Sequence, residues 1–230
     1  MLSMNVLALL RRVFEREQVY YERQQAMIGQ QLTARGIADQ RVLHAMTQVP
    51  RHMFVPEKMR EYAYADCALP IEDGQTISQP FMVAYMLQAL RLDGSERVLD
   101  VGTGSGYAAA VLSLLAAHVY TIERSPVLAN SARERLAQLG YTNISVVEGD
   151  GTEGLPMYAP FDAISVAAAS PWIPRPLLSQ LAHCGRLVIP VGSYDQQLLI
   201  RATCQDGEVL TEQLGKVRFV PLIGEHGWTN

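Results

Sequence analysis

The sequence predicts an open α/β fold, in which helices cover a doubly wound, mostly parallel sheet. Apolar runs with strand character recur at 97–101, 118–122 and 144–148, with helical segments between them. A glycine-rich turn at 102–106 follows the first of these strands and leads into an Ala/Leu-rich helix at 107–117. Strands alternating with helices, with a glycine turn after the first strand, are typical of nucleotide-binding α/β sheets.

The part of the chain before the glycine turn is predicted to be helical. Helices are expected at 22–35 and 39–48, separated by Gly36, and Asp39 caps the second of them. Two more helices are expected at 57–64 and 80–91, the latter with Pro80 in its first turn.

The alternation of strands and helices continues after the glycine turn. We expect further helices at 126–139 and 174–182 and further strands at 161–166 and 186–190. Residues 196–204 and 208–218 are predicted to close the sheet as an antiparallel hairpin around the Asp206-Gly207 turn.

The N-terminal residues 5–24 are predicted to form an amphipathic helix, because apolar residues recur there at helical spacing: Val6, Leu9, Leu10, Val13 and Phe14. We expect this helix to pack on the domain or on a partner, and a helix lying on a membrane surface is the alternative. The apolar run 4–10 is short and is followed, not preceded, by arginines, which argues against a secretory signal.

Composition excludes several classes of function. The 230 residues, 49% of them hydrophobic, suit one large domain. A net charge of −4 gives no electrostatic case for binding nucleic acid or an anionic membrane. The three cysteines, Cys67, Cys184 and Cys204, are far apart and odd in number, which argues against a disulfide framework and a zinc site and favours a reducing cytoplasm. No apolar stretch approaches the ~18 residues that span a membrane.

The glycine turn differs from the dinucleotide fingerprint. Its glycines are Gly102, Gly104 and Gly106, whereas that fingerprint needs the third glycine at 107, where Tyr107 stands. Asp100 lies just before the turn. A carboxylate there suits a cationic group, such as the amino group of S-adenosylmethionine, better than a pyrophosphate.

Acids also follow the next two strands. Glu123 ends the second strand, about 20 residues past the turn, where a carboxylate can accept both hydrogen bonds of a ribose diol. Asp150, between Gly149 and Gly151, could accept from an adenine amine. Either acid alone is typical of a solvated turn. Together with Asp100, at consecutive strand ends, they predict a cofactor site.

The polar segment 73–80 precedes a predicted helix and lies outside the sheet pattern. Ser78 and Pro80 have a simple structural interpretation, as the N-terminal cap and first turn of that helix. Alternatively, a hydroxyl and free N–H groups at a helix N-terminus can receive a carboxylate. Such a receptor over the cofactor site would hold an anionic acceptor beside the methyl sulfonium.

Over about residues 25–224 the chain resembles the protein-L-isoaspartate (D-aspartate) O-methyltransferase family. The most specific motif is Thr76-Ile77-Ser78-Gln79-Pro80. The others are Gln30-Gln31-Leu32, Arg35-Gly36-Ile37, the blocks 49–56 and 63–66, the glycine turn, Gly149-Asp150-Gly151, 161–164, 167–169, 185–192 and 217–222. Ala167 departs from the threonine or glycine expected there, which would reshape the floor of the acceptor pocket.

The resemblance implies a Rossmann-like class I methyltransferase fold with N-terminal helices and a C-terminal hairpin. The reaction it implies is transfer of a methyl group from S-adenosyl-L-methionine to the α-carboxylate of an L-isoaspartyl residue or the side-chain carboxylate of a D-aspartyl residue. S-adenosyl-L-homocysteine would be the other product. Such a carboxylate, with a pKa near ~3.9, is ionised at pH 7 and needs no general base. The methyl ester would cyclise to a succinimide, which starts repair of the damaged protein.

The resemblance also implies roles for individual residues. Ser78 would orient the acceptor oxygen, and Thr76 and Ile77 would line the junction between acceptor and cofactor. The methionine moiety would be bound by Asp100, Gly102, Thr103, Gly104, Ser105 and Gly106, the ribose by Glu123, and the adenine end by Asp150 and Gly151. Arg218 and Phe219 would close over the peptide. Arg51 and His52 are interpreted as a structural turn beside Pro50, with a substrate clamp as the alternative.

We therefore expect a helical extension at 1–24 and a single methyltransferase domain at 25–230. Within it, 25–91 would be a helical region on the substrate side and 92–230 the cofactor-binding sheet with the hairpin. The expected partners are isoaspartyl or D-aspartyl peptides and proteins, acted on by a monomer whose N-terminal helix is a candidate oligomer contact. Two alternatives remain: a same-fold enzyme that methylates an aspartate of one dedicated peptide, which would carry an extra domain, and a non-catalytic adaptor.

Overall fold

The computed structural model describes residues 4–205 and 207–229, with backbone only for 4–13. Its centre is a seven-stranded sheet in the order β5-β4-β3-β6-β7-β8-β9. The strands are β3 (Arg97–Val101), β4 (His118–Glu123), β5 (Ile144–Glu148), β6 (Phe161–Val166), β7 (Leu181–Gly192), β8 (Gln197–Gln205) and β9 (Glu208–Val217). The neighbouring strands β5, β4, β3, β6 and β7 pair in parallel. β8 and β9 add an antiparallel hairpin at the edge next to β7. This confirms the predicted fold class.

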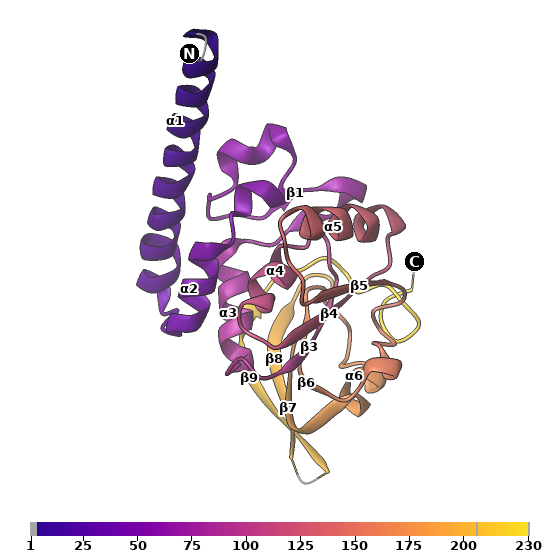
Figure 1. Cartoon of the computed structure of the whole chain (residues 1–230). Helices are drawn as coiled ribbons and strands as arrows, with labels where there is room; N and C mark the ends of the chain where they lie inside the picture. Colours follow the sequence, from indigo (N-terminus) through magenta and orange to yellow (C-terminus); the bar gives the residue numbers. More distant parts are fainter. Residues whose placement is uncertain (1–3, 206, 230) are drawn as a thin grey trace.

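Helices cover both faces of the sheet (Figure 1). One face packs against α2 (Gln40–Gln48), α3 (Pro80–Leu90), α4 (Tyr107–Ser113) and α5 (Pro126–Gln138), and the other against α6 (Arg175–Ser179). Side chains of β3 alternate between the two cores: Val98 enters the first, and Leu99 and Val101 enter the second. Because both faces are covered there, the central strands β3 and β6 are mostly apolar and buried, whereas the edge strand β9 is largely exposed.

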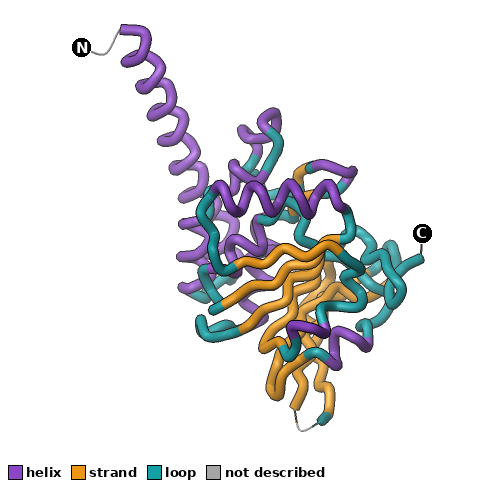
Figure 2. Tube along the Cα trace, turned by 45° about the vertical axis from the view of Figure 1, so that its right-hand side comes forward, coloured by secondary structure: helices purple, strands orange, loops and turns teal. Residues whose placement is uncertain are grey.

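The N-terminal helix is longer than predicted. α1 (Met4–Ala26) continues through the π-helical turn η1 (Met27–Leu32) and the 3₁₀ turn η2 (Thr33–Arg35) up to Gly36. The expected helices at 5–24 and 22–35 are therefore one helical run. Its first turns project from the body in both views (Figures 1 and 2). Side chains of the expected apolar stripe before Phe14 lie outside the described ones, and Phe14 is exposed.

The second half of α1 is attached to the domain. Tyr20 stacks on His52, with ring centroids 4.0 Å apart. The buried Gln24 amide donates to the carbonyls of Met46 at 2.9 Å and Val49 at 3.0 Å. The helix thus crosses the predicted domain boundary at 24–25 without a break. No helix in the described part of the chain is long and apolar enough to cross a membrane.

Most other predicted elements are confirmed, and three boundaries were wrong. The helix after the glycine turn ends at Ser113 because the Asn143 amide donates to the Ser113 carbonyl at 2.9 Å. α6 ends at Ser179 and β7 begins at Leu181, since the buried Gln180 side chain binds backbone at Leu155 and Glu153. The segment expected as a helix at 57–64 is the 3₁₀ helix η4 (Glu57–Tyr62).

The closing hairpin has the predicted strands, and Asp206 of its predicted turn lies outside the described residues. Asp39 caps α2 as predicted and accepts from the backbone N–H groups of Arg41 and Val42. A short ribbon that the sequence did not predict, β1 (Leu69–Pro70) with β2 (Thr76–Ile77), precedes α3.

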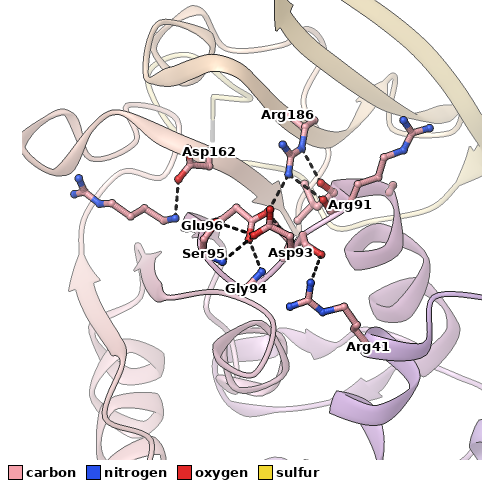
Figure 3. A network of polar contacts seen from close by, with 12 residues as sticks. Arg41, Arg91, Asp93, Gly94, Ser95, Glu96, Asp162 and Arg186 are labelled. Carbon is pink, nitrogen blue, oxygen red and sulfur yellow. Dashed lines mark hydrogen bonds and ion pairs between the residues drawn. The ribbon is translucent and has the colours of Figure 1, made fainter.

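Arginines from three elements hold the C-terminal end of α3, and Figure 3 shows two of them, Arg41 and Arg186. Arg186 of β7 donates to the carbonyls of Leu90 at 2.8 Å and Arg91 at 3.1 Å. Arg41 of α2 donates to the Leu92 carbonyl, and Arg201 of β8 donates to that of Ala89. Cations at a helix C-terminus satisfy its free carbonyls and its dipole. This capping orients α3, whose other end carries the segment 76–80.

Glu96 completes this network below α3. Its buried carboxylate accepts from the N–H groups of Asp93 at 2.7 Å and Gly94 at 2.8 Å, and Arg186 lies 3.3 Å away (Figure 3). The loop between α3 and β3 is therefore built around one buried carboxylate, which fixes where β3 enters the sheet.

Glu96→Gln should lower the free energy of unfolding by about 2–4 kcal/mol. The substitution removes the charge that faces Arg186 and turns an NH₂ group toward a backbone donor. Urea denaturation measures the loss, and the exposed Glu134→Gln is the control, with an expected change within about 0.5 kcal/mol. Equal stability of the two variants would contradict the role assigned to Glu96.

Candidate active site

A pocket of about 390 Å³ opens at the carboxyl ends of β3 and β4. Its wall combines the glycine turn at 102–105, the end of β4 at 122–126, and residues of the segment 73–78. Ala167 and Ala168 after β6, Gly151 after β5, and the C-terminal segment 220–223 complete it. β3 lies between β4 and β6, so the pocket occupies the place where open α/β sheets bind ligands.

The backbone of the glycine turn has conformations that residues other than glycine rarely adopt. Gly102 has φ 92° and Gly104 has φ 52°, both in the left-handed region. The Gly102 N–H donates to the Ile122 carbonyl at 2.9 Å, which folds the turn across the end of β4. Gly106, with φ 87°, lies outside the pocket wall, and a Cβ there would come within 3.3 Å of Leu136. Gly106 therefore allows α4 and α5 to pack closely.

Glu123 lines the pocket with a carboxylate that the backbone already holds. Its Oε2 accepts from the Gly104 N–H at 2.9 Å, and its Oε1 accepts from the Ser125 N–H at 3.0 Å. Each carboxylate oxygen can accept a further hydrogen bond. The buried side chain is thus fixed in orientation and keeps free acceptor positions, and its binding of a ribose diol stays a prediction.

Asp100 lies beneath the pocket wall and does not line it. Asp100 is fully buried, and its Oδ2 accepts from the Thr121 hydroxyl at 2.9 Å. The same Thr121 hydroxyl lies 2.6 Å from the hydroxyl of Thr103, which lines the pocket. Among the described residues, nothing hydrogen-bonds to Oδ1. Burial raises the pKa of Asp100 to about 7, against the opposing Thr121 hydrogen bond. The structure thus links Asp100 to the pocket wall through two threonines, and its contact with the methionine moiety stays a prediction.

Asp150 holds the C-terminal segment instead of lining the pocket. Its Oδ1 accepts from the N–H group and hydroxyl of Thr152, and its Oδ2 accepts from the Glu225 N–H at 2.8 Å. Burial opposes ionisation, but these hydrogen bonds outweigh it and keep the pKa of Asp150 below its usual value. Gly151 does line the pocket, and a Cβ there would lie 2.6 Å from Val101. Only glycine therefore fits against the pocket floor at 151.

The segment 76–78 brings Thr76, Ile77 and Ser78 to the pocket opposite the glycine turn. The interpretation of Ser78 as the cap of α3 is wrong, because Gln79 precedes Pro80 at the helix start and no side chain caps it. Within the described part of the chain, no hydrogen-bond partner is found for the Ser78 hydroxyl, and the residue is half-buried. The Ser78 carbonyl, by contrast, accepts from Arg51 at 2.8 Å. The hydroxyl is thus available to a ligand.

The C-terminal wall was only partly predicted. Arg218 and Phe219 do not line the pocket; Val220 to Ile223 do. This segment runs along the end of β6, where the Leu222 N–H donates to the Ala169 carbonyl at 2.7 Å. Ala167 lies on the floor, 3.6 Å from where a Cβ of Gly102 would be. The apolar motif 219–222 could have predicted this wall, because an apolar run after the hairpin is expected to pack against the domain.

Asp100→Asn should flatten the dependence of stability on pH. Folded Asp100 keeps its proton up to about pH 7, whereas an exposed aspartate releases it near ~3.9. The folded state therefore binds more protons in this range, and its free energy of unfolding falls as the pH rises through it, by about 4 kcal/mol at most. Urea denaturation at about pH 5 and pH 8 measures this fall, which the Asn variant should lack.

The matched control for Asp100 is the exposed Asp195→Asn, which should retain the pH dependence of the wild type. If Asp100→Asn and the wild type lose the same stability between the two pH values, Asp100 is ionised in the folded protein throughout this range.

Comparison with known proteins finds one family over most of the chain. The family model described as protein-L-isoaspartate(D-aspartate) O-methyltransferase (PCMT) matches residues 22–227. A protein-L-isoaspartate O-methyltransferase of Roseiflexus sp. (strain RS-1) is 61% identical over 198 residues, which are 86% of this chain and 91% of the relative. Protein-L-isoaspartate O-methyltransferase 1 of Geotalea uraniireducens is 56% identical over 90% of this chain and 95% of its own.

Solved structures show the same fold. A protein-L-isoaspartate O-methyltransferase superposes with a TM-score of 0.79 at 28% identity, over 89% of this chain and 67% of its own. A beta-aspartate methyltransferase (PCMT) from Plasmodium falciparum, in complex with S-adenosyl-L-homocysteine, gives 0.75 at 28% identity over 86% and 97%. The chain therefore belongs to the protein-L-isoaspartate (D-aspartate) O-methyltransferase family and has its S-adenosylmethionine-dependent methyltransferase fold.

Proposed function

We propose that this protein transfers the methyl group of S-adenosyl-L-methionine to the α-carboxylate of L-isoaspartyl residues, or to the side-chain carboxylate of D-aspartyl residues, in damaged proteins. One observation carries the proposal: the unpartnered Ser78 hydroxyl lines the same pocket as Glu123 and the glycine turn. Family membership supports the reaction, and the S-adenosyl-L-homocysteine bound to the Plasmodium relative supports the cofactor.

The pocket fits this cofactor. Its volume of about 390 Å³ lies in the range of small-molecule sites. The backbone of Gly102 to Ser105 would bind the methionine moiety, Glu123 the ribose diol, and Gly151 the adenine end. Asp100 and Asp150 would support these contacts through Thr121, Thr103 and Thr152. When bound, the cofactor supplies an electrophilic methyl group on a sulfonium.

The residues of the acceptor side position an anion that is already reactive. An isoaspartyl carboxylate, with a pKa near ~3.9, carries its negative charge at pH 7, so no proton needs to be removed. The Ser78 hydroxyl donates to one acceptor oxygen and orients it. The apolar walls formed by Ile77, Val220 and Leu222 exclude water from the carboxylate. Such orientation can lower the activation free energy of a reaction by ~7–11 kcal/mol. The ester then closes to a succinimide, whose hydrolysis returns part of the residue as normal aspartate.

The oligomeric state, the partners and the compartment of the protein are also part of this proposal. We also propose that a monomer is active, with α1 as an appendage to one methyltransferase domain and a candidate oligomer contact. Peptides with altered aspartyl residues are the expected partners. The free Cys67 and Cys184 are exposed, which suits a reducing cytoplasm.

The reaction is tested with labelled S-adenosyl-L-methionine and two peptides that differ only in one aspartyl linkage, normal or iso. The proposal expects a base-labile methyl ester on the isoaspartyl peptide alone. Methylation of neither peptide, with cofactor still bound, would refute it and favour the alternatives: an enzyme for one dedicated aspartyl peptide, or an adaptor.

Ser78→Ala should lower kcat on the isoaspartyl peptide roughly 10–100-fold, because it removes a hydrogen bond to a charged oxygen. Affinity for S-adenosyl-L-methionine should stay within about threefold, since Ser78 caps no helix. The exposed Ser179→Ala, outside the pocket, should behave as wild type. Loss of cofactor binding in Ser78→Ala would instead mean that the hydroxyl supports the fold.

Glu123→Ala should weaken cofactor binding roughly 10–100-fold, because the ribose diol loses two charged acceptors and the glycine turn loses its hydrogen bond. Calorimetric titration with S-adenosyl-L-homocysteine measures this effect. Glu148 pairs with Glu123 in the sheet but is exposed and outside the pocket, so Glu148→Ala is the matched control. Equal affinity of the two variants would refute the ribose assignment.

A further inference from the structure

Arg51 is a fully buried arginine that connects the two sides of the pocket. It begins the 3₁₀ helix η3 (Arg51–Phe54), and its side chain has no exposed surface. Its Nε donates to the Ala63 carbonyl at 2.7 Å, and its Nη2 donates to the Ser78 carbonyl at 2.8 Å. Its guanidinium also lies 4.8 Å from the ring centroid of Tyr107, the first residue of α4 and part of the pocket wall.

The Arg51 charge lacks a counter-ion in the part of the chain that the structure describes. Across the described residues no carboxylate lies within salt-bridge distance of Arg51, and its buried Nη1 has no hydrogen-bond partner. Burial lowers the pKa of Arg51, and the neighbouring Tyr107 opposes this shift only in part. A buried, incompletely satisfied cation reduces stability compared with an apolar side chain of similar size. Fold stability alone therefore does not explain an arginine here.

The contact with Ser78 gives Arg51 a place in the reaction. Since the guanidinium binds the Ser78 carbonyl from inside the domain, the side chain of the same residue is left to line the pocket. The planar fork reaches two carbonyls from segments that are far apart in sequence, which the single ammonium of a lysine cannot reproduce. The acceptor carboxylate would bring the missing negative charge to the segment that Arg51 holds.

We propose that Arg51 is a positioning residue for methyl transfer: acting through the Ser78 carbonyl, it holds the Ser78 hydroxyl where the acceptor carboxylate binds. The inference rests on the proposed function of Ser78 and extends it to a residue outside the pocket. It extends the sequence-based interpretation of Arg51 as part of a structural turn after Pro50, and it replaces the alternative of a clamp that touches the substrate, since the side chain is fully buried.

The test measures kcat and the affinity for S-adenosyl-L-homocysteine in Arg51→Met and Arg51→Lys. Arg51→Met should lower kcat on the isoaspartyl peptide roughly 10–100-fold, but no further than Ser78→Ala does, because Arg51 acts through the Ser78 hydroxyl. Affinity for S-adenosyl-L-homocysteine should stay within about threefold. Arg51→Lys should recover part of kcat, because it retains the charge and can reach one of the two carbonyls. Rates are expressed per S-adenosyl-L-homocysteine binding site, so that an unfolded fraction does not count.

Arg97→Met is the matched control. Arg97, at the start of β3, donates to the Tyr158 carbonyl and lies over the Tyr120 ring, and it is outside the pocket, so its loss should lower the melting temperature but not kcat per site. Coupling supplies the second readout: Arg51→Met combined with Ser78→Ala should be no slower than Ser78→Ala alone. Multiplied losses in the double variant would overturn the inference.

The inference is also overturned if Arg51→Met loses only thermal stability and keeps the wild-type kcat per site. If Arg51→Met does not fold, a folded Arg51→Lys with unchanged kcat has the same consequence. Failure of the wild type to methylate the isoaspartyl peptide is a distinct result, because it removes the proposed function and the inference with it.

Discussion

The site depends on the position of β3 between β4 and β6. The chain leaves β3 through the glycine turn toward β4, and later returns on the other side of β3 as β6. Connections that diverge in this way leave a crevice at the carboxyl ends of the strands. Glu123 and Ala167 therefore meet at one pocket although they are far apart in sequence. The short segments 73–78 and 220–223 complete the pocket wall.

The acceptor side is held by arginines, of which Arg51 is fully buried. Arg186 and its neighbours fix the C-terminal end of α3, and Arg51 binds the Ser78 carbonyl just before its N-terminus. A helix attached at both ends presents the Ser78 segment to the pocket in one orientation. Because the reaction needs positioning and no proton transfer, a rigid support is the main contribution that the protein can make.

Local patterns predicted the strands, the glycine turn and Glu123, because strand ends in a parallel sheet converge on one edge. Local patterns did not predict the direction of a side chain or the hydrogen bonds that a segment distant in sequence makes to it. Asp100 faces Thr121 below the pocket, and Asp150 is occupied by Thr152 and by the backbone of Glu225, 75 residues away. Arg51 follows a proline in an unremarkable turn, and only its burial against the Ser78 carbonyl shows its role.

The most direct test of this account is a crystal structure of the protein with S-adenosyl-L-homocysteine and an isoaspartyl peptide. It should show the ribose hydroxyls on the Glu123 carboxylate and one oxygen of the isoaspartyl α-carboxylate within hydrogen-bond distance of the Ser78 Oγ. Arg51 should still bind the Ser78 carbonyl in that complex. A peptide carboxylate seated away from Ser78, with the Ser78 hydroxyl turned to the protein, would contradict the account.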